Sequence, residues 1–132
     1  MAATFNFELV TPERLVFSGE ATQVVVPGAE GDFAVLVGHA PFISTLRPGI
    51  LEVTLPQGTQ RLLVKKGVAE ADPTRLTVLA QSAVPVDELY GARLTSELQL
   101  AEAQAAEAKD DHARMNAATL IDLLKRLQLK AA

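Results

Sequence analysis

The chain has 132 residues, a net charge of −4 at pH 7 and a sequence pI near 5.1, and it contains no cysteine. The acidic balance and the lack of a basic stripe exclude a protein that binds a nucleic-acid backbone, because that affinity rests on clustered Lys and Arg. The lack of cysteine excludes disulfides, thiolate nucleophiles and cysteine-based metal sites, and it fits a reducing compartment.

Hydrophobic residues make up 48% of the chain and aromatic residues only 5%, so the core must consist mainly of Val, Leu, Ile and Ala. The start of the chain lacks the charged and apolar segments of a signal peptide, and it also lacks a transit peptide. These features favour a bacterial protein over a mature organellar one. No apolar run approaches the ~18 residues of a membrane-spanning helix.

Short alternating or β-branched runs, separated by turn residues, predict a β domain over residues 1–85. Pairs such as Pro27-Gly28 and Pro48-Gly49 supply the turns, because Gly allows positive φ and Pro fixes its own φ. Many short strands with frequent turns are typical of a sandwich or barrel. The predicted strands are Phe5–Val10, Leu15–Phe17, Thr22–Val26, Phe33–Val37, Ile50–Leu55, Arg61–Lys65, Val68–Ala71 and Leu76–Leu79.

Residues 86–132 follow a different pattern, with a single glycine and no proline. Apolar residues recur at helical spacing and form two stripes, which predicts two amphipathic helices. The first stripe is rich in alanine, so a second helix can approach closely and an antiparallel hairpin buries both stripes. The stripes are Leu94, Leu98, Ala101, Ala105 and Ala108, then Ala117, Leu120, Ile121, Leu124 and Leu127.

The break between these helices is predicted at Lys109-Asp110-Asp111-His112. Either Asp can cap a new helix by accepting a backbone N–H. No Gly or Pro forces a turn, so residues 87–132 are also compatible with one straight helix about 70 Å long. Both conformations remain open at this stage.

The segment 27–42 is the candidate for chemistry, because it concentrates glycine, proline, acidic residues and a histidine. A phosphate loop is excluded, since no Gly-Lys-Ser/Thr follows and a strand comes next instead of a helix. His39 has no neighbouring partner set, so a structural or interfacial role is favoured over a general base or metal ligand. Glu30 and Asp32 are interpreted as exposed turn carboxylates. No catalytic or metal site is predicted.

The run from Gly28 to Val53, GAEGDFAVLVGHAPFISTLRPGILEV, closely resembles the most characteristic segment of the epsilon subunits of F-type ATP synthases. In that family a Gly-x-x-Gly turn leads through a strand into Gly-His-x-Pro and then Leu-x-x-Gly. Further resemblance lies in Val10-Thr11-Pro12-Glu13, in Lys66-Gly67-Val68-Ala69-Glu70 and in Leu76-Thr77-Val78-Leu79-Ala80. Together these segments cover nearly all of the β half, whereas the helical half resembles the family only in type and length.

The resemblance implies an α+β protein: a flattened β sandwich of about ten strands over residues 1–85, then an antiparallel two-helix hairpin over 86–132. It implies a non-catalytic rotor subunit of the proton-translocating enzyme, placed between the gamma subunit and the c-ring and carrying no cofactor. Such a subunit lies at the cytoplasmic face of the bacterial plasma (inner) membrane and is membrane-associated only through the complex. By the same resemblance, Glu30, Gly31, Asp32 and His39 belong to the c-ring interface.

The helical half departs from the family at its nucleotide-sensing motif, Ile/Leu-Asp-x-x-Arg-Ala. Aligning on Asp87 puts Tyr90 and Gly91 where Arg and Ala belong, and the register that recovers Arg93 loses the Asp. A helix-capping role for Asp87 is therefore favoured, and Asp87 and Arg93 are weak candidates for ATP binding. The resemblance also implies transient contact with the catalytic alpha/beta hexamer, through Arg114, Lys125, Arg126 and Lys130.

Two other functions compete with this interpretation. The first is a stand-alone β-sandwich binding module whose hairpin serves an unrelated partner. The second is a small hydrolase that uses His39. Stable association with a gamma subunit separates the rotor subunit from the binding module, and turnover by the isolated chain would favour the hydrolase.

Overall fold

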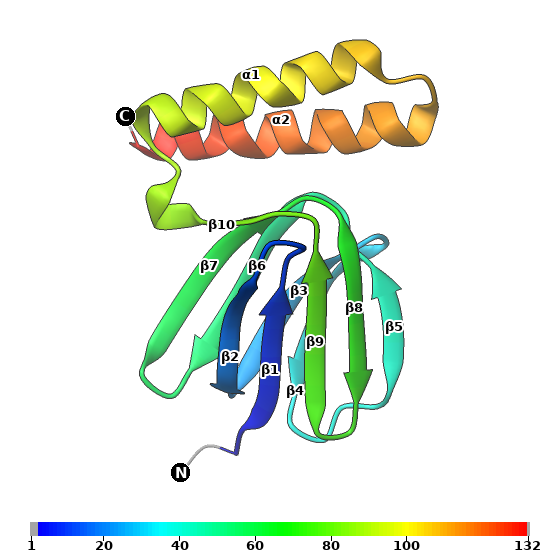
Figure 1. Cartoon of the computed structure of the whole chain (residues 1–132), viewed down its shortest axis with the longest axis vertical. Coiled ribbons are helices and arrows are strands. Elements are labelled where there is room, and N and C mark those ends of the chain that lie inside the picture. The colour runs from blue at the N-terminus through cyan, green and yellow to red at the C-terminus, as the bar shows by residue number, and fades with distance from the viewer. Residues whose placement is uncertain (1–2, 132) are drawn as a thin grey trace. The chain divides into compact units, whose positions relative to one another are not determined.

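The computed structural model describes residues 3–131 and divides the chain into two structural units, Met1–Pro85 and Val86–Ala132. The division falls where proline and glycine give way to sequence rich in alanine and leucine. Within residues 3–131, the first unit holds ten strands in two sheets, and the second holds two α-helices (Figure 1). The predicted β sandwich followed by a helical hairpin is confirmed.

The first sheet is built around a parallel pair, β1 and β9. β1 also pairs with β2 in the antiparallel direction, and Val16 lacks a partner in that ladder because Leu9 faces Phe17 while Val10 faces Leu15. Such a bulge increases the local twist of the strand pair. In sheet order the strands are β2 (Leu15–Ala21), β1 (Phe5–Val10), β9 (Arg75–Ala80), β8 (Gly67–Asp72) and β5 (Phe42–Thr45).

The second sheet is antiparallel throughout. Its edges are the three-residue strand β10 and the strand β4, which follows β3 through a tight turn. In sheet order the strands are β10 (Ala83–Pro85), β7 (Gly58–Val64), β6 (Gly49–Leu55), β3 (Gln23–Gly28) and β4 (Gly31–Leu36).

The core of the sandwich consists of the inward-facing residues of both sheets, because side chains alternate between the two faces of each strand. In β1 this alternation buries Phe5, Phe7 and Leu9, and Phe7 packs against Phe17 with 5.7 Å between ring centroids. Most of the remaining core is aliphatic, as the composition predicts. It includes Val24, Val26, Val35, Leu51, Val53, Leu62, Val64, Leu76 and Val78.

Each of the eight predicted runs overlaps a strand, but β5 and β10 lay outside the prediction. β5 has only four residues and two of them are Ser44 and Thr45, while β10 ends at Pro85. Both are edge strands, where pairing on one side tolerates short length and proline. β2 also continues beyond the predicted Phe17 to Ala21, because Ser18, Gly19 and Glu20 pair with β1.

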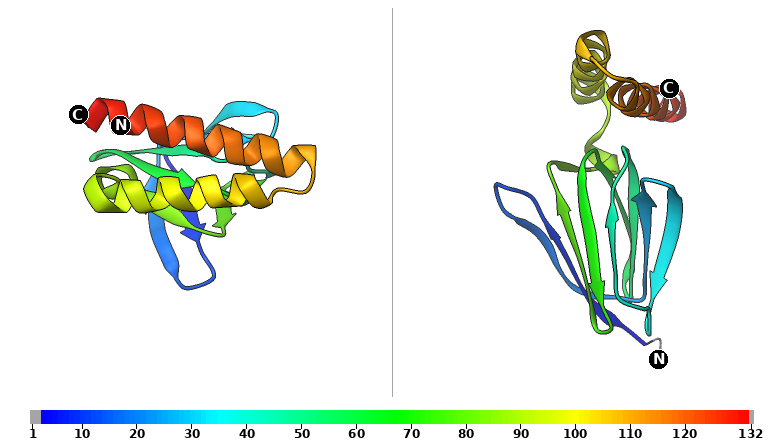
Figure 2. Two further views of the ribbon diagram at one scale, coloured as in Figure 1. Left: turned by 90° about the horizontal axis from the view of Figure 1, so that it is seen from above. Right: turned by 90° about the vertical axis from the view of Figure 1, so that its right-hand side faces the viewer.

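The second unit contains a 3₁₀ turn (η1, Val86–Glu88) and the helices α1 (Gly91–Glu107) and α2 (Asp111–Ala131). The helices lie side by side and run in opposite directions (Figure 2). Both predicted stripes are confirmed: Leu94, Ala101, Ala117, Leu120 and Leu124 are buried, and the other members are half-buried.

The starts of the two helices differ in how well the sequence predicted them. The Asp110 carboxylate accepts a hydrogen bond from the Ala113 N–H at 2.7 Å, so the predicted aspartate cap of α2 is confirmed. The predicted cap of α1 is wrong: its N-cap is Tyr90, and Asp87 lies within η1. Gly91 explains the later start, because its φ of +55° turns the chain into the helix where a side chain would be strained.

Candidate functional site

The acidic turn between β3 and β4 is a tight two-residue connection. Gly28 faces Gly31 across the ladder, which leaves Ala29 and Glu30 at the tip. Gly31 has a φ of +140°, a conformation that side chains disfavour, so glycine is required for the chain to reverse here. The turn thus places the Glu30 carboxylate at an exposed tip, with Asp32 at the start of β4.

The link between β5 and β6 is hydrogen-bonded to this turn. The Ala29 N–H donates to the Thr45 carbonyl at 2.9 Å, and the Arg47 N–H donates to the Pro27 carbonyl at 3.0 Å. One nitrogen of the Arg47 guanidinium donates to Asp32 Oδ1 at 2.7 Å. The β3–β4 turn and the link between β5 and β6 are distant in sequence but are bonded to each other, and we call them together the platform.

Close packing explains the density of Gly and Pro in the platform. A Cβ on Gly49 would lie 2.6 Å from the Pro27 Cβ, and a Cβ on Gly28 would lie 2.7 Å from the Phe33 ring. Both distances are too short for carbon atoms that are not bonded to each other. The Phe33 ring in turn meets Phe42 edge to face at 5.2 Å. Glycine is present at these two positions because the Pro27 and Phe33 side chains occupy the space that a Cβ would need, and no anion is needed to explain it.

His39 lies at the opposite end of β4 from Glu30. A strand of six residues spans about 20 Å, so the structure does not bring His39 together with Glu30, Gly31 and Asp32. His39 Nδ1 is 2.8 Å from the Leu36 carbonyl, and Nε2 is 2.5 Å from the Asp72 carbonyl. Its ring meets Phe5 edge to face at 5.3 Å. Half-buried among backbone carbonyls, His39 ties the β4–β5 loop to the turn between β8 and β9.

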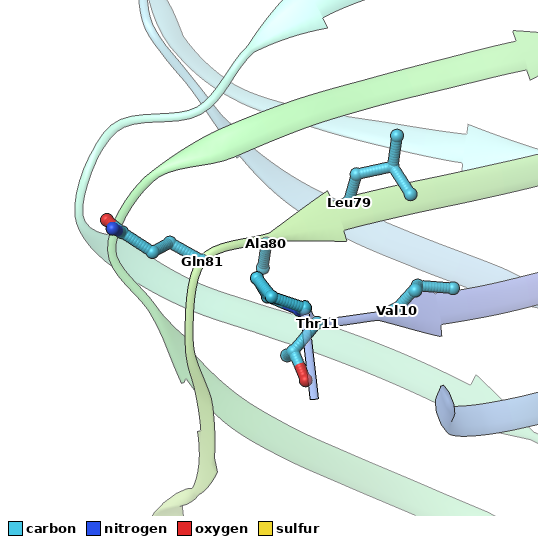
Figure 3. A pocket seen from close by; sticks show the side chains of 6 residues that line it. Val10, Thr11, Leu79, Ala80 and Gln81 are labelled. Carbon is cyan, nitrogen blue, oxygen red and sulfur yellow. The ribbon is translucent and has the colours of Figure 1, made fainter. Parts of the chain in front are cut away.

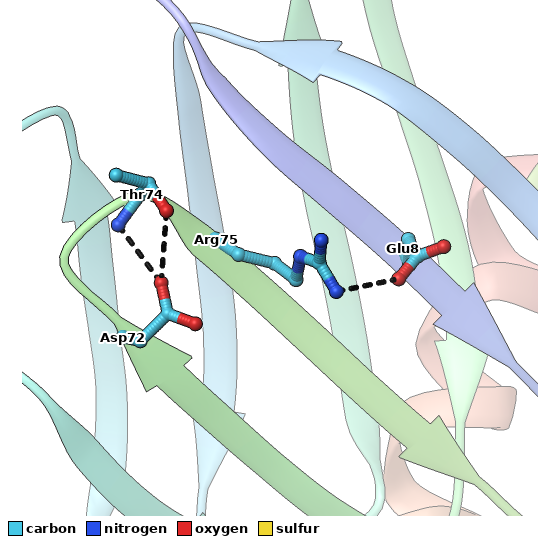
Figure 4. A network of polar contacts seen from close by, with 4 residues as sticks. All are labelled: Glu8, Asp72, Thr74 and Arg75. Carbon is cyan, nitrogen blue, oxygen red and sulfur yellow. Dashed lines mark hydrogen bonds and ion pairs between the residues drawn. The ribbon is translucent and has the colours of Figure 1, made fainter.

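The β8–β9 turn is stabilised by its own side chains (Figure 4). Asp72 Oδ1 accepts hydrogen bonds from the Thr74 N–H at 2.9 Å and from the Thr74 hydroxyl at 3.1 Å. The bond from the Thr74 N–H is the main reason that the pKa of Asp72 lies below its ordinary value of 3.8. Arg75 reaches Glu8 on β1 at 3.9 Å. Hydrogen bonds within the turn and an ion pair to the neighbouring strand account for these charges, and no substrate is needed.

The outer face of the first sheet carries an apolar row that the sequence analysis missed. Leu15, Val10, Leu79 and Val68 are aligned in register across four strands, and Thr45 continues the row on β5. Leu15 is 52% exposed and Leu79 is 44% exposed. The next row, Ser18, Glu8, Thr77, Glu70 and Ile43, is mostly polar. We call Leu15, Val10, Leu79 and Val68 the apolar row.

A shallow apolar hollow of about 340 Å³ adjoins the apolar row. Figure 3 shows Val10 and Leu79 projecting to the same side of neighbouring strands. The sequence signal for this face was Val10 and Leu79 at positions where strand alternation calls for polar residues. The hollow is lined by Val10, Thr11, Pro12, Leu79, Ala80 and Gln81.

The candidate nucleotide residues of the second unit do not converge. Arg93 pairs with Glu88 at 3.0 Å, and both side chains are about half exposed. A hollow of about 400 Å³ is lined by Glu88, Tyr90, Ala92 and Arg93, and Asp87 is not part of that lining. Arg93, the cation that would hold a phosphate, is already paired with the Glu88 carboxylate. That carboxylate also adds a negative charge to the lining of the hollow, which disfavours a phosphate.

The four basic residues of α2 fall into two kinds. Arg114 pairs with Asp111 at 2.7 Å and Arg126 pairs with Asp122 at 3.1 Å, both within the helix. Lys125 and Lys130 are exposed toward the C-terminal end of the helix. Only part of this positive charge is therefore uncompensated.

Within residues 3–131, no group of His, Asp and Glu side chains has an arrangement that would hold a metal ion. In the described part of the chain, neither helix combines the length and apolar character needed to cross a membrane.

Comparison with known proteins gives a consistent result. A family model described as ATP synthase, Delta/Epsilon chain, beta-sandwich domain matches residues 4–86. The ATP synthase epsilon chain of Parvibaculum lavamentivorans is 48% identical over 129 residues, which cover 97% of this chain and 98% of that protein. A chain in the Euglena gracilis mitochondrial ATP synthase structure (OSCP/F1/c-ring) has a TM-score of 0.73 at 22% identity, covering 98% of this chain and 82% of that one. A chain in the Tetrahymena thermophila mitochondrial ATP synthase central stalk and c-ring structure has a TM-score of 0.68 at 10% identity, covering 92% and 93%. These two structures share the fold.

Proposed function

The chain belongs to the ATP synthase epsilon-chain family, and from this premise we propose that it is a non-catalytic rotor subunit that couples gamma to the c-ring. The solved structures with the same fold are chains of assemblies described as F1/c-ring and central stalk/c-ring, which supports this place in the enzyme. A two-layer sandwich packed at core density deforms little, as torque transmission requires. Attachment to the bacterial plasma membrane, on its cytoplasmic face, follows from the complex.

The observation that carries the proposal is the apolar row on the first sheet. Aliphatic side chains aligned in register on a sheet face, with Leu15 and Leu79 about half exposed, are typical of a surface that another protein covers. We assign this face to gamma. The polar row beside it, with Glu8, Thr77 and Glu70, is then the rim of that contact.

Co-expression with gamma tests this assignment. We expect the wild-type chain to form a stable gamma complex and to show no ATPase activity alone. Leu79→Glu should weaken that complex at least about tenfold, because it buries a charge in an apolar contact. Thr59→Glu, at an exposed position on β7 of the other sheet, is the matched control and should retain binding.

The outcomes of this experiment separate the candidate functions. Failure of the wild-type chain to bind gamma would refute the rotor assignment and leave the stand-alone binding module. Undiminished binding by Leu79→Glu would place gamma elsewhere on the sandwich. Turnover by the isolated chain would revive a hydrolase that uses His39.

For the c-ring contact we propose the acidic turn Glu30-Gly31-Asp32. Exposed carboxylates at the solvated edge of an interface guide the approach and orientation of the partner more than they raise its affinity. Reversing both charges, Glu30→Lys with Asp32→Lys, should therefore impair ATP-driven proton pumping more than soluble ATP hydrolysis. The impairment should shrink as salt is added. Pumping that is unchanged in the double variant would remove the turn from the interface.

A further inference from the structure

The two carboxylates of the acidic turn differ in what they contact. Within residues 3–131, the Glu30 side chain makes no hydrogen bond or ion pair, whereas Asp32 is bound to Arg47 at 2.7 Å. The Asp32 side chain is 60% exposed and that of Arg47 only 32%. The charge of Asp32 is therefore compensated by the chain's own guanidinium, and Glu30 is the uncompensated charge at the tip.

Arg47 is held in place by more than this ion pair. Its backbone N–H donates to Pro27, and Leu46 forms a β-bridge with Gly28. Its Nη1 atom is buried, and within the described residues it has no hydrogen-bond partner. A Cβ on Gly49 would lie 3.5 Å from that atom. Because the guanidinium is partly enclosed, loss of Asp32 would leave its charge without a counter-ion and would loosen the platform under the turn.

We propose that Asp32 and Arg47 act as one positioning unit, which fixes the turn so that the Glu30 carboxylate alone meets the c-ring. This inference rests on the proposed c-ring contact and refines it. The partner group implied is a cation or an amide N–H donor on a polar loop, since a carboxylate accepts hydrogen bonds. Asp32 then affects docking only through Arg47.

A double-mutant cycle on the assembled enzyme tests the proposal, with the ratio of proton pumping to ATP hydrolysis as the readout. We expect Asp32→Asn and Arg47→Gln each to lower that ratio by about twofold, the scale of a single exposed ion pair. The double variant should be no worse than either single variant, because both remove the same interaction. The swap Asp32→Arg with Arg47→Asp should restore part of the loss, which a carboxylate in direct contact with the ring would not allow.

Arg61→Gln is the matched control, because it breaks the comparable exposed pair with Glu52 at 3.3 Å on the second sheet. It should leave the ratio unchanged, and the thermal stability of each variant shows whether the subunit still folds. A loss for Asp32→Asn with none for Arg47→Gln, or losses that multiply in the double variant, would overturn the proposal. A ratio that is unaffected even by Glu30→Lys with Asp32→Lys would instead refute the underlying c-ring contact.

Discussion

Gly58 and Gly67 have the same φ of +152° but different surroundings. A Cβ on Gly58 would meet nothing within 4 Å, whereas one on Gly67 would collide with the Leu79 carbonyl and lie 2.9 Å from the Ala80 Cα. Gly58→Ala should therefore cost only the backbone strain, about 1–3 kcal/mol of unfolding free energy. Gly67→Ala should cost roughly 1–3 kcal/mol more. Urea unfolding of both variants measures the difference, and equal losses would contradict the steric account.

The lowered pKa of Asp72 predicts a stability contribution that disappears in acid. A carboxyl group whose pKa is lower in the folded chain stabilises the fold above its ordinary pKa, and this contribution is lost as the pH falls through the lowered value. Asp72→Ala should therefore lower the Tm at pH 7, and the difference from wild type should narrow below about pH 4. Glu70→Ala, an exposed position on the same strand, controls for net charge. A difference that does not change with pH would contradict the prediction.

At the residue scale, the sequence pointed to the candidate residues but did not show which of them contact one another. Glu30 and Asp32 look equivalent in sequence, because nothing local shows that Arg47 reaches only one of them. His39 was predicted to be structural or interfacial, yet its contacts come from Asp72 and Phe5, which are distant in the chain. Such contacts depend on strand order, and single-residue patterns carry no information about that order.

The connection between α1 and α2 gives a prediction at the scale of an element. Asp110→Ala removes the hydrogen bond to the Ala113 N–H and should destabilise the hairpin by about 1 kcal/mol. Asp111→Ala removes only the exposed pair with Arg114 and should cost less than about 0.5 kcal/mol. Amide exchange at the start of α2 distinguishes the two variants. Faster exchange in Asp111→Ala than in Asp110→Ala would show that the cap is assigned to the wrong aspartate.

The type of an element was predictable where its apolar residues recur at regular spacing. Alternation located β1 and β9, and helical spacing located both stripes of the hairpin, because burial imposes those periods directly. Pairing was not predictable, since the alternation that β1, β6 and β9 share does not show which strands are neighbours. The parallel neighbours β1 and β9 therefore could not be distinguished from other pairs, and the apolar row that crosses them went unnoticed.

At the scale of the whole molecule, the two units differ in what their surfaces offer. The sandwich exposes the apolar row and the acidic turn, which we propose as contacts for two different partners, whereas the hairpin buries most of its two apolar stripes and exposes a few scattered apolar side chains such as Leu100, Met115 and Leu129. The Glu88–Arg93 pair and the partly compensated charge of α2 offer little preference for a nucleotide or for an extended state. A switch requires ligands that bind its two states differently.

We therefore predict that residues 87–132 act as a comparatively weak brake on ATP hydrolysis and do not sense ATP. Truncation after Val86 should raise hydrolysis by the reassembled enzyme only slightly, because the folded hairpin already buries the apolar stripes that the extended tail would expose. Titration of the intact subunit with ATP should show no micromolar binding. Several-fold activation on truncation would establish a strong brake, and micromolar affinity would establish sensing.

The parallel pairing of β1 with β9 also governs when the β unit is able to fold during synthesis. β1 is complete at Val10, but its parallel partner begins only at Arg75. Until then Phe5, Phe7 and Leu9 have only the hairpin partner β2, and an isolated two-stranded ribbon is marginal in water. Because such distant pairing is slow to form, the first sheet is completed only late in the synthesis of this unit. The synthesis of β9, near the end of this unit, therefore decides when the apolar side chains of β1 are fully buried.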